Sequence, residues 1–131
     1  MAGAEAFVNG LKARGATLAV ATSSFRQLFE LKTQKHPWFS LFDEIVCGDD
    51  PLVKKPKPAP DIFLAAAERL GVAATECVIF EDSPAGVQAA LASGARVIAL
   101  IDPQMDRAVY GGVHAIIEKY ADLDFQAAPG A

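Results

Sequence analysis

Two adjacent carboxylates, Glu81 and Asp82, follow an apolar run in the stretch VIFEDSPAGVQAALASG, residues 78–94. Neighbouring carboxylates repel each other, and the edge of a hydrophobic core is a poor environment for either of them. Mg²⁺ is a hard cation that prefers oxygen ligands, and carboxylates supply them. The pair therefore indicates a divalent-cation site directly after a strand.

Hydroxyl and ammonium groups occur in two other stretches. Thr22, Ser23 and Ser24 follow an apolar run and precede an expected helix, whose N-terminal N–H groups attract anions. Lys57 lies in KKPKPAP, where alternating prolines hold the backbone extended. Each feature alone has an ordinary explanation, as a helix cap or a solvated lysine. Together with the carboxylates, they are the groups that bind and polarise a phosphoryl group.

Strands that alternate with helices must position these groups. Ser83 suits an N-cap, Pro84 a first helical position and Gly94 a helix end, and Asp61 suits the cap of an earlier helix. Strands are predicted at residues 17–21, 44–47, 77–80, 96–101 and 115–117, and helices at 4–14, 24–35, 62–70 and 84–93. This pattern predicts an α/β fold, a three-layer Rossmann-like parallel sheet with helices on both faces. Ligands of such sheets bind outside the carboxyl ends of the strands.

The composition limits the class of protein. With 131 residues we expect one domain, residues 1–125, and a frayed tail, residues 126–131. The net charge of −4 and the lack of Lys/Arg clusters argue against nucleic acid as a partner. The apolar runs are too short to span a membrane, and the first residues lack the features of a secretory signal. We therefore predict no membrane partner and a cytoplasmic location.

Three stretches carry a family resemblance. LAVATSS, KPAPDIFLAAAERLG and VIFEDSPAGVQAALASG resemble motifs II, III and IV of the haloacid dehalogenase-like hydrolase superfamily. The resemblance is to the phosphatase branch that includes β-phosphoglucomutase and pseudouridine-5′-phosphatase, and it covers essentially the whole chain. It implies a parallel sheet flanked by helices. It also implies a Mg²⁺-dependent phosphatase that acts on small phosphorylated metabolites, sugar or nucleoside phosphates, through an aspartyl-phosphate.

The resemblance also implies roles for individual residues. Thr22 would bind the transferring phosphoryl oxygen, and Lys57 would neutralise charge on the nucleophile and the phosphoryl group. Asp82 would coordinate Mg²⁺ directly, with Glu81 acting mostly through a bound water. The catalytic residues would be Lys57 and Thr22, the phosphate-binding residues Thr22, Ser23, Ser24 and Lys57, and the metal ligands Asp82 and Glu81.

Motif I of the family, an Asp-x-Asp pair after the first strand, has no counterpart here, and neither does the helical cap. The triplet Asp122–Leu123–Asp124 follows no buried strand, and we interpret it as solvated surface. The substrate cannot be inferred without the cap. Two hypotheses follow: part of a phosphatase core that is inactive alone, or a non-catalytic remnant that binds phosphate or metal weakly or associates with another chain. An Asp-x-Asp encoded upstream would distinguish them. A phospho-acceptor receiver domain is a weaker third reading, because receivers lack KPAPD before the acidic pair.

The resemblance raises a question about the sheet. In the family, the strand that carries motif I lies between the strands predicted at 17–21 and 77–80. Without it, both neighbours would carry unpaired backbone groups, and each such buried group costs about 1–3 kcal/mol. Three outcomes would relieve this: the two strands could pair directly, a second copy could fill the gap by self-association, or the missing segment could belong to the protein but be absent from the chain as given. We expect direct pairing or self-association rather than an open gap.

Overall fold

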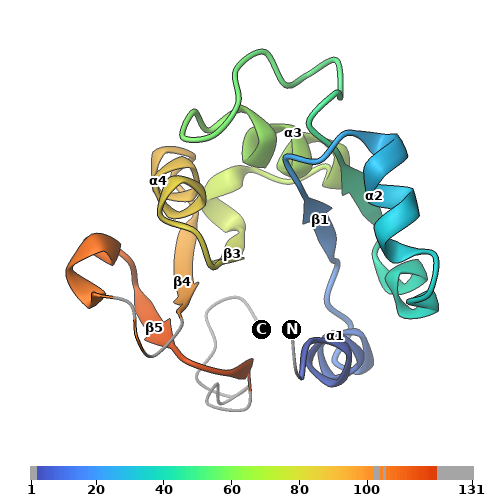
Figure 1. The fold of residues 1–131 in the computed structure, drawn as a ribbon, viewed down its shortest axis with the longest axis horizontal. Helices are drawn as coiled ribbons and strands as arrows, with labels where there is room; N and C mark the ends of the chain where they lie inside the picture. The colour runs from blue at the N-terminus through green and yellow to red at the C-terminus, as the bar shows by residue number, and fades with distance from the viewer. Residues whose placement is uncertain (1–2, 102–103, 105, 121–131) are drawn as a thin grey trace.

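The computed structural model describes residues 3–101, 104 and 106–120, in which helices and strands alternate (Figure 1). The α-helices are α1 (Ala4–Ala13), α2 (Arg26–Thr33), α3 (Asp61–Leu70) and α4 (Pro84–Ala92). The strands are β1 (Ala19–Ala21), β2 (Glu44–Val46), β3 (Val78–Glu81), β4 (Arg96–Leu100) and β5 (Ala115–Ile117). Short 3₁₀ helices span Pro37–Leu41, Ala74–Glu76 and Arg107–Tyr110. The triplet 122–124 and the predicted tail 126–131 lie outside the described residues.

All strand pairs are parallel, and they form two separate sheets. β1 pairs with β2, with Ala19 opposite Glu44, while β3, β4 and β5 form the second sheet in that order. The predicted α/β class and parallel strands are therefore confirmed. Figure 1 shows the chain curving round an open centre, with β1 on one side and β3 on the other.

The expected direct pairing of β1 with β3 is wrong. Helix α3 contacts β1 and β2 and also packs against α4, which covers β3 and β4, so the helices hold the sheets apart. On the opposite side, the ring of Phe7 in α1 lies 5.0 Å from that of Phe80 in β3. Our expectation assumed that unpaired edge groups would be buried. All residues of β1 and β3 are instead only half-buried, so water can reach the open edges.

The hydrophobic core centres on β4. Val97, Ile98 and Ala99 are completely buried there. Val97 and Ala99 face the side covered by α3 and α4, and Ile98 faces the other side, toward Phe80. This continuous apolar strand is the kind that is covered on both faces of a parallel sheet. The second sheet is therefore the better packed of the two.

One predicted helix start agrees with the structure, and two predicted starts differ from it. The Ser83 hydroxyl accepts a hydrogen bond from the Gly86 N–H at 3.0 Å, as predicted for an N-cap. Asp61 does not cap α3; its carboxylate accepts the N–H groups of Lys54 and Lys55, each at 3.0 Å. Helix α2 begins two residues later than predicted.

The surface of α2 also differs from expectation. We predicted that its apolar side chains lie mostly on one side, but Phe25, Leu28 and Leu31 are exposed and only Phe29 is buried. Within the described residues, no helix has both the length and the apolar character needed to cross a bilayer.

Candidate active site

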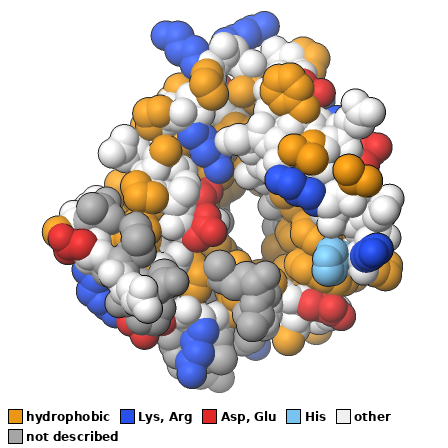
Figure 2. All heavy atoms as spheres, in the orientation of Figure 1, with side chains coloured by type: hydrophobic (Ala, Val, Ile, Leu, Met, Phe, Trp, Pro, Cys, Tyr) orange, Lys and Arg blue, Asp and Glu red, His pale blue; other side chains and the backbone are white. Residues whose placement is uncertain are grey.

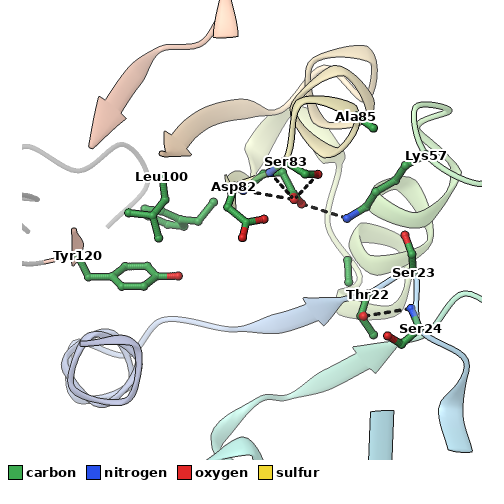
Figure 3. Close-up of a pocket in the computed structure, with 12 residues that line it drawn as sticks. Thr22, Ser23, Ser24, Lys57, Asp82, Ser83, Ala85, Leu100 and Tyr120 are labelled. Atoms are coloured by element: carbon green, nitrogen blue, oxygen red, sulfur yellow. Dashed lines mark hydrogen bonds and ion pairs between the residues drawn. The ribbon is translucent and has the colours of Figure 1, made fainter. Parts of the chain in front are cut away.

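A pocket of about 670 Å³ lies at the carboxyl ends of β1 and β3 (Figure 3). The turn after β1, the loop before α3 and the turn after β3 supply most of its polar lining, and Leu100 of β4 and Tyr120 also line it. The pocket contains all six residues that the sequence singled out, namely Thr22, Ser23, Ser24, Lys57, Glu81 and Asp82. The fold thus brings together hydroxyls, an ammonium group and carboxylates from distant parts of the sequence. Their chemical roles stay predictions.

Glu81 is fixed by several hydrogen bonds. Its Oε2 forms an ion pair with Lys57 Nζ at 3.1 Å, and the two side chains are only 10% and 14% exposed, respectively. Its Oε1 accepts the Asp82 N–H at 3.3 Å, the Ser83 N–H at 3.3 Å and the Ser83 hydroxyl at 3.2 Å (Figure 3). Both carboxylate oxygens are therefore engaged by the protein. This arrangement suits a residue that acts on a metal through water.

Lys57 reaches the pocket from a loop that is held in place. The Asp61 carboxylate binds the backbone of the preceding residues, Lys54 and Lys55, and the peptide bond from Lys57 to Pro58 is cis. Lys57 Nζ lies 5.1 Å from the centre of the Phe63 ring, a favourable distance for a cation over an aromatic face. An ammonium group has three donors. Lys57 can therefore bind Glu81 and still donate to an anion in the pocket.

Asp82 supplies the carboxylate that faces the open pocket, on the side of Tyr120 (Figure 3). Partial burial raises the pKa of Asp82, and a hydrogen bond with Glu81 and repulsion from it raise the pKa further, while Lys57 lowers it. A second cation beside Asp82 would offset this repulsion. The Asp82 backbone is anchored, because its carbonyl accepts the hydroxyl of the buried Tyr110 at 3.0 Å.

Asp82 and Glu81 fit a Mg²⁺ site only together with further ligands, namely water and a substrate phosphate. No cluster of three acidic, His or Cys side chains that could hold a metal occurs in the described part of the chain. Mg²⁺ usually binds through one or two carboxylates, water and the substrate phosphate. Asp82 can serve as one direct ligand, with Glu81 behind it. Such a site would bind the metal weakly until a phosphate completes it.

The hydroxyl side of the pocket is built differently. Thr22 Oγ1 accepts the Ser24 N–H at 3.2 Å, and the Ser24 hydroxyl accepts Lys32 Nζ of α2 at 3.2 Å. The predicted anion cradle relied on free N–H groups at the start of α2. The Arg26 N–H there already donates to Asp49 Oδ1 at 3.0 Å. The protein therefore already uses one of the N–H groups on which the predicted cradle relied.

Two glycines that sequence reasoning did not assign to the site shape it. A Cβ on Gly86 would collide with the Glu81 carboxyl group, so only glycine lets Glu81 lie against the start of α4. A Cβ on Gly48 would collide with the Ser23 carbonyl, and the Gly48 N–H donates to the Ser24 carbonyl at 2.9 Å. The position of Gly86, three residues after a serine N-cap, is the signal that could have identified it.

Comparison with known proteins places these features in a family. Residues 1–100 match the haloacid dehalogenase-like hydrolase family. The chain is 42% identical over 127 residues to a probable pseudouridine-5′-phosphatase of Drosophila melanogaster, an alignment that covers 94% of this chain and 55% of the relative. It is 43% identical over 127 residues to (DL)-glycerol-3-phosphatase 1 of Arabidopsis thaliana, covering 94% of this chain and 43% of that protein.

A solved structure of the same family has a similar fold. The haloacid dehalogenase family hydrolase of Deinococcus radiodurans, with bound phosphate and sodium, has a TM-score of 0.84 and 28% identity, covering 93% of this chain and 56% of that one. The chain thus spans about half the length of the relatives it matches. The match over residues 1–100, together with the shared parallel α/β architecture, shows that the chain belongs to the haloacid dehalogenase-like hydrolase family.

Proposed function

We propose that the six pocket residues form the phosphate- and metal-binding part of a phosphomonoester hydrolase site. The observation that carries this proposal is the convergence of Thr22, Lys57 and Asp82 on one pocket at the carboxyl ends of β1 and β3. The names of the matched relatives, a pseudouridine phosphatase and a glycerol phosphatase, support small phosphorylated metabolites as the substrate class.

Each group has a part in this proposal. Lys57 donates to a phosphoryl oxygen while Glu81 holds the ammonium group in place. The hydroxyl of Thr22, with Ser23 and Ser24 beside it, binds a second oxygen. Asp82 holds Mg²⁺, which when bound neutralises charge on the phosphoryl group. The support lies in the donor set: fixed cation, hydroxyls and an open carboxylate are what phosphoryl transfer requires around its substrate.

A covalent mechanism needs a nucleophilic carboxylate, and the residues described here do not place one opposite Lys57. We therefore propose that residues 1–131 alone bind phosphate with Mg²⁺ weakly and do not hydrolyse phosphomonoesters detectably. A colorimetric assay with p-nitrophenyl phosphate tests this second point. Turnover that disappears in Asp82→Asn would contradict it, because it would reveal a nucleophile within the chain.

Titration calorimetry with inorganic phosphate and Mg²⁺ tests the binding site. We expect Lys57→Gln to weaken phosphate binding at least about tenfold, because hydrogen bonds to charged groups contribute about 1.5–3 kcal/mol. Lys55→Gln is the matched control, since Lys55 lies in the same loop with an exposed side chain outside the pocket. Thr22→Val is a second variant that leaves the Lys57–Glu81 pair intact. Equal affinity in the wild type and all three variants would overturn the proposal.

A further inference from the structure

A second lysine reaches the pocket from α2. Lys32 Nζ donates to the Ser24 hydroxyl at 3.2 Å, and Ser24 lines the pocket beside Thr22. Lys32 lies in the last turn of α2, where a cation ordinarily offsets the negative end of the helix dipole. Its ammonium group instead extends toward the opposite end of the helix, the direction in which helical side chains lean. The helix dipole therefore does not account for the contact with Ser24.

The loop before α2 holds Ser24 where Lys32 can reach it. The two residues are eight positions apart, and a continuous helix would separate them by about 12 Å along its axis. The extended backbone of Phe25, with φ −71° and ψ 155°, interrupts that path. The Ser24 N–H donates to Thr22 Oγ1 at 3.2 Å, and the Ser24 carbonyl accepts the Gly48 N–H at 2.9 Å. Both backbone polar groups of Ser24 are therefore fixed by the protein.

The hydroxyls on this side of the pocket are both set to donate. A serine or threonine hydroxyl has one hydrogen to donate and two lone pairs that accept. Thr22 Oγ1 accepts the Ser24 N–H, and Ser24 Oγ accepts the Lys32 ammonium group. Among the residues that the structure describes, none accepts a hydrogen bond from either hydroxyl. Both hydrogens are therefore left for a ligand, and a phosphoryl oxygen, which only accepts, matches them.

Charge divides the pocket in the same way. On the β3 side, Lys57 is paired with Glu81, and Asp82 adds a second carboxylate. On the β1 side, Lys32 forms no ion pair within the described part of the chain. Figure 2 shows acidic side chains at the border of the central opening on the β3 side and a basic side chain at its border on the α2 side. Lys32 thus brings positive charge to the side that holds the hydroxyls.

We propose that Lys32 is a positioning residue for the bound anion, and that it holds the Ser24 hydroxyl so that its hydrogen points toward a phosphoryl oxygen. A hydroxyl that accepts from an ammonium group is also a stronger donor, because successive hydrogen bonds polarise one another. This inference rests on the proposed function and deepens it, since it gives α2 a part in phosphate binding.

NMR titration with inorganic phosphate in the presence of Mg²⁺ tests the inference, with the amide signals of Ser23 and Ser24 as the readout. We expect Lys32→Met to weaken phosphate binding at least about fivefold, because it removes a charge-assisted hydrogen bond. Lys32→Arg keeps a charged donor and should bind phosphate within about twofold of the wild type. Lys35→Met is the matched control, because it removes the same charge from an exposed side chain just after α2, outside the pocket lining.

A double-mutant cycle with Ser24→Ala separates an action through Ser24 from a direct attraction of phosphate. In the Ser24→Ala background, Lys32→Met should weaken phosphate binding by no more than about twofold. The Lys32 side chain is exposed, so Lys32→Met should fold and melt at the same temperature as Lys35→Met. A purely structural role at the end of the helix would instead lower the melting temperature and leave phosphate affinity unchanged.

Three results would overturn the inference. They are wild-type phosphate affinity in Lys32→Met, equal losses in Lys32→Met and Lys35→Met, and an effect of Lys32→Met that is the same with and without the Ser24 hydroxyl. The outcomes also separate the inference from the proposed function. A loss of affinity in Lys57→Gln with none in Lys32→Met would remove the inference alone, whereas a wild-type chain that binds no phosphate would remove both.

Discussion

The two sheets that carry the site differ in how well they are packed. In the three-stranded sheet, β4 has a completely buried centre formed by Val97, Ile98 and Ala99. In the two-stranded sheet, β1 is half-buried along its whole length, and only the last residue of β2, Val46, is fully buried. Both sheets end in a half-buried strand that faces the gap between them, β1 in one and β3 in the other. The three-stranded sheet differs in having a completely buried neighbour, β4, behind that strand.

The turns at the strand ends show the same difference. After β3, Glu81 accepts four hydrogen bonds or ion-pair contacts, and Tyr110 anchors the next residue. After β1, the Thr22 side chain makes one hydrogen bond, to the backbone of Ser24. The carboxylate side is therefore held by more hydrogen bonds than the Thr22 side chain.

The largest expected effect comes from matched Val→Ala changes in the two sheets. Val97→Ala should lower the free energy of unfolding by about 2–3 kcal/mol, because it removes buried methyl groups and leaves a cavity. Val20→Ala removes the same atoms from a half-buried position and should cost about 1 kcal/mol or less. Urea denaturation measures both. Equal costs for the two substitutions would contradict the difference in packing that we describe.

The architecture and the pocket residues could be predicted from sequence because they depend on local patterns. A continuous apolar run followed by Glu81, Asp82 and a serine cap specifies a strand, a turn and a helix almost regardless of the rest of the chain. The carboxyl ends of β1 and β3 then meet at one pocket, which places Thr22 near those carboxylates, while Lys57 comes from the loop before α3.

The absence of pairing between β1 and β3 could not be predicted in this way. Whether β1 pairs with β3 depends on how far apart α3 holds the sheets and on how much water reaches the edges, and neither is encoded in a short pattern. Asp61 shows the same limit, because a carboxylate before a helix can cap it or bind a loop, and only the fold decides. The exposed face of α2 likewise shows that an apolar stripe does not establish burial.

A smaller effect is expected from Gly86→Ala. The new Cβ would displace the Glu81 carboxyl group and break its contacts with Ser83 and Lys57, at a cost of about 1–3 kcal/mol that outweighs the gain in helix propensity. Gly111→Ala is the control, because a Cβ there meets nothing closer than 3.8 Å.

Thermal unfolding and the NMR signals of the Lys57 side chain measure this effect. We expect Gly86→Ala to lower the melting temperature and to shift those signals, and Gly111→Ala to do neither. A Gly86→Ala protein with wild-type stability and unchanged Lys57 signals would mean that Glu81 is not held against α4, and the proposed preorganisation of the carboxylate side would fail.

The smallest effect concerns the salt bridge that ties the loop after β2 to α3. Hydrogen bonds from Arg69, followed by one from the Leu52 N–H, lower the pKa of Asp50 below its ordinary value of 3.8. A carboxylate whose pKa is lower in the folded state stabilises the fold above its ordinary pKa, and this contribution disappears as the pH falls through the folded-state pKa. Asp50→Asn should therefore destabilise the protein at pH 7 by less than Val97→Ala or Gly86→Ala does. The difference in stability from the wild type should vanish in strong acid.

Glu68→Gln, an exposed change on α3, is the control and should have little effect at pH 7. If the deficit of Asp50→Asn persisted undiminished under acid conditions, the Asp50–Arg69 charge pair would not be what fastens the weaker sheet to α3, and packing alone would have to explain its position.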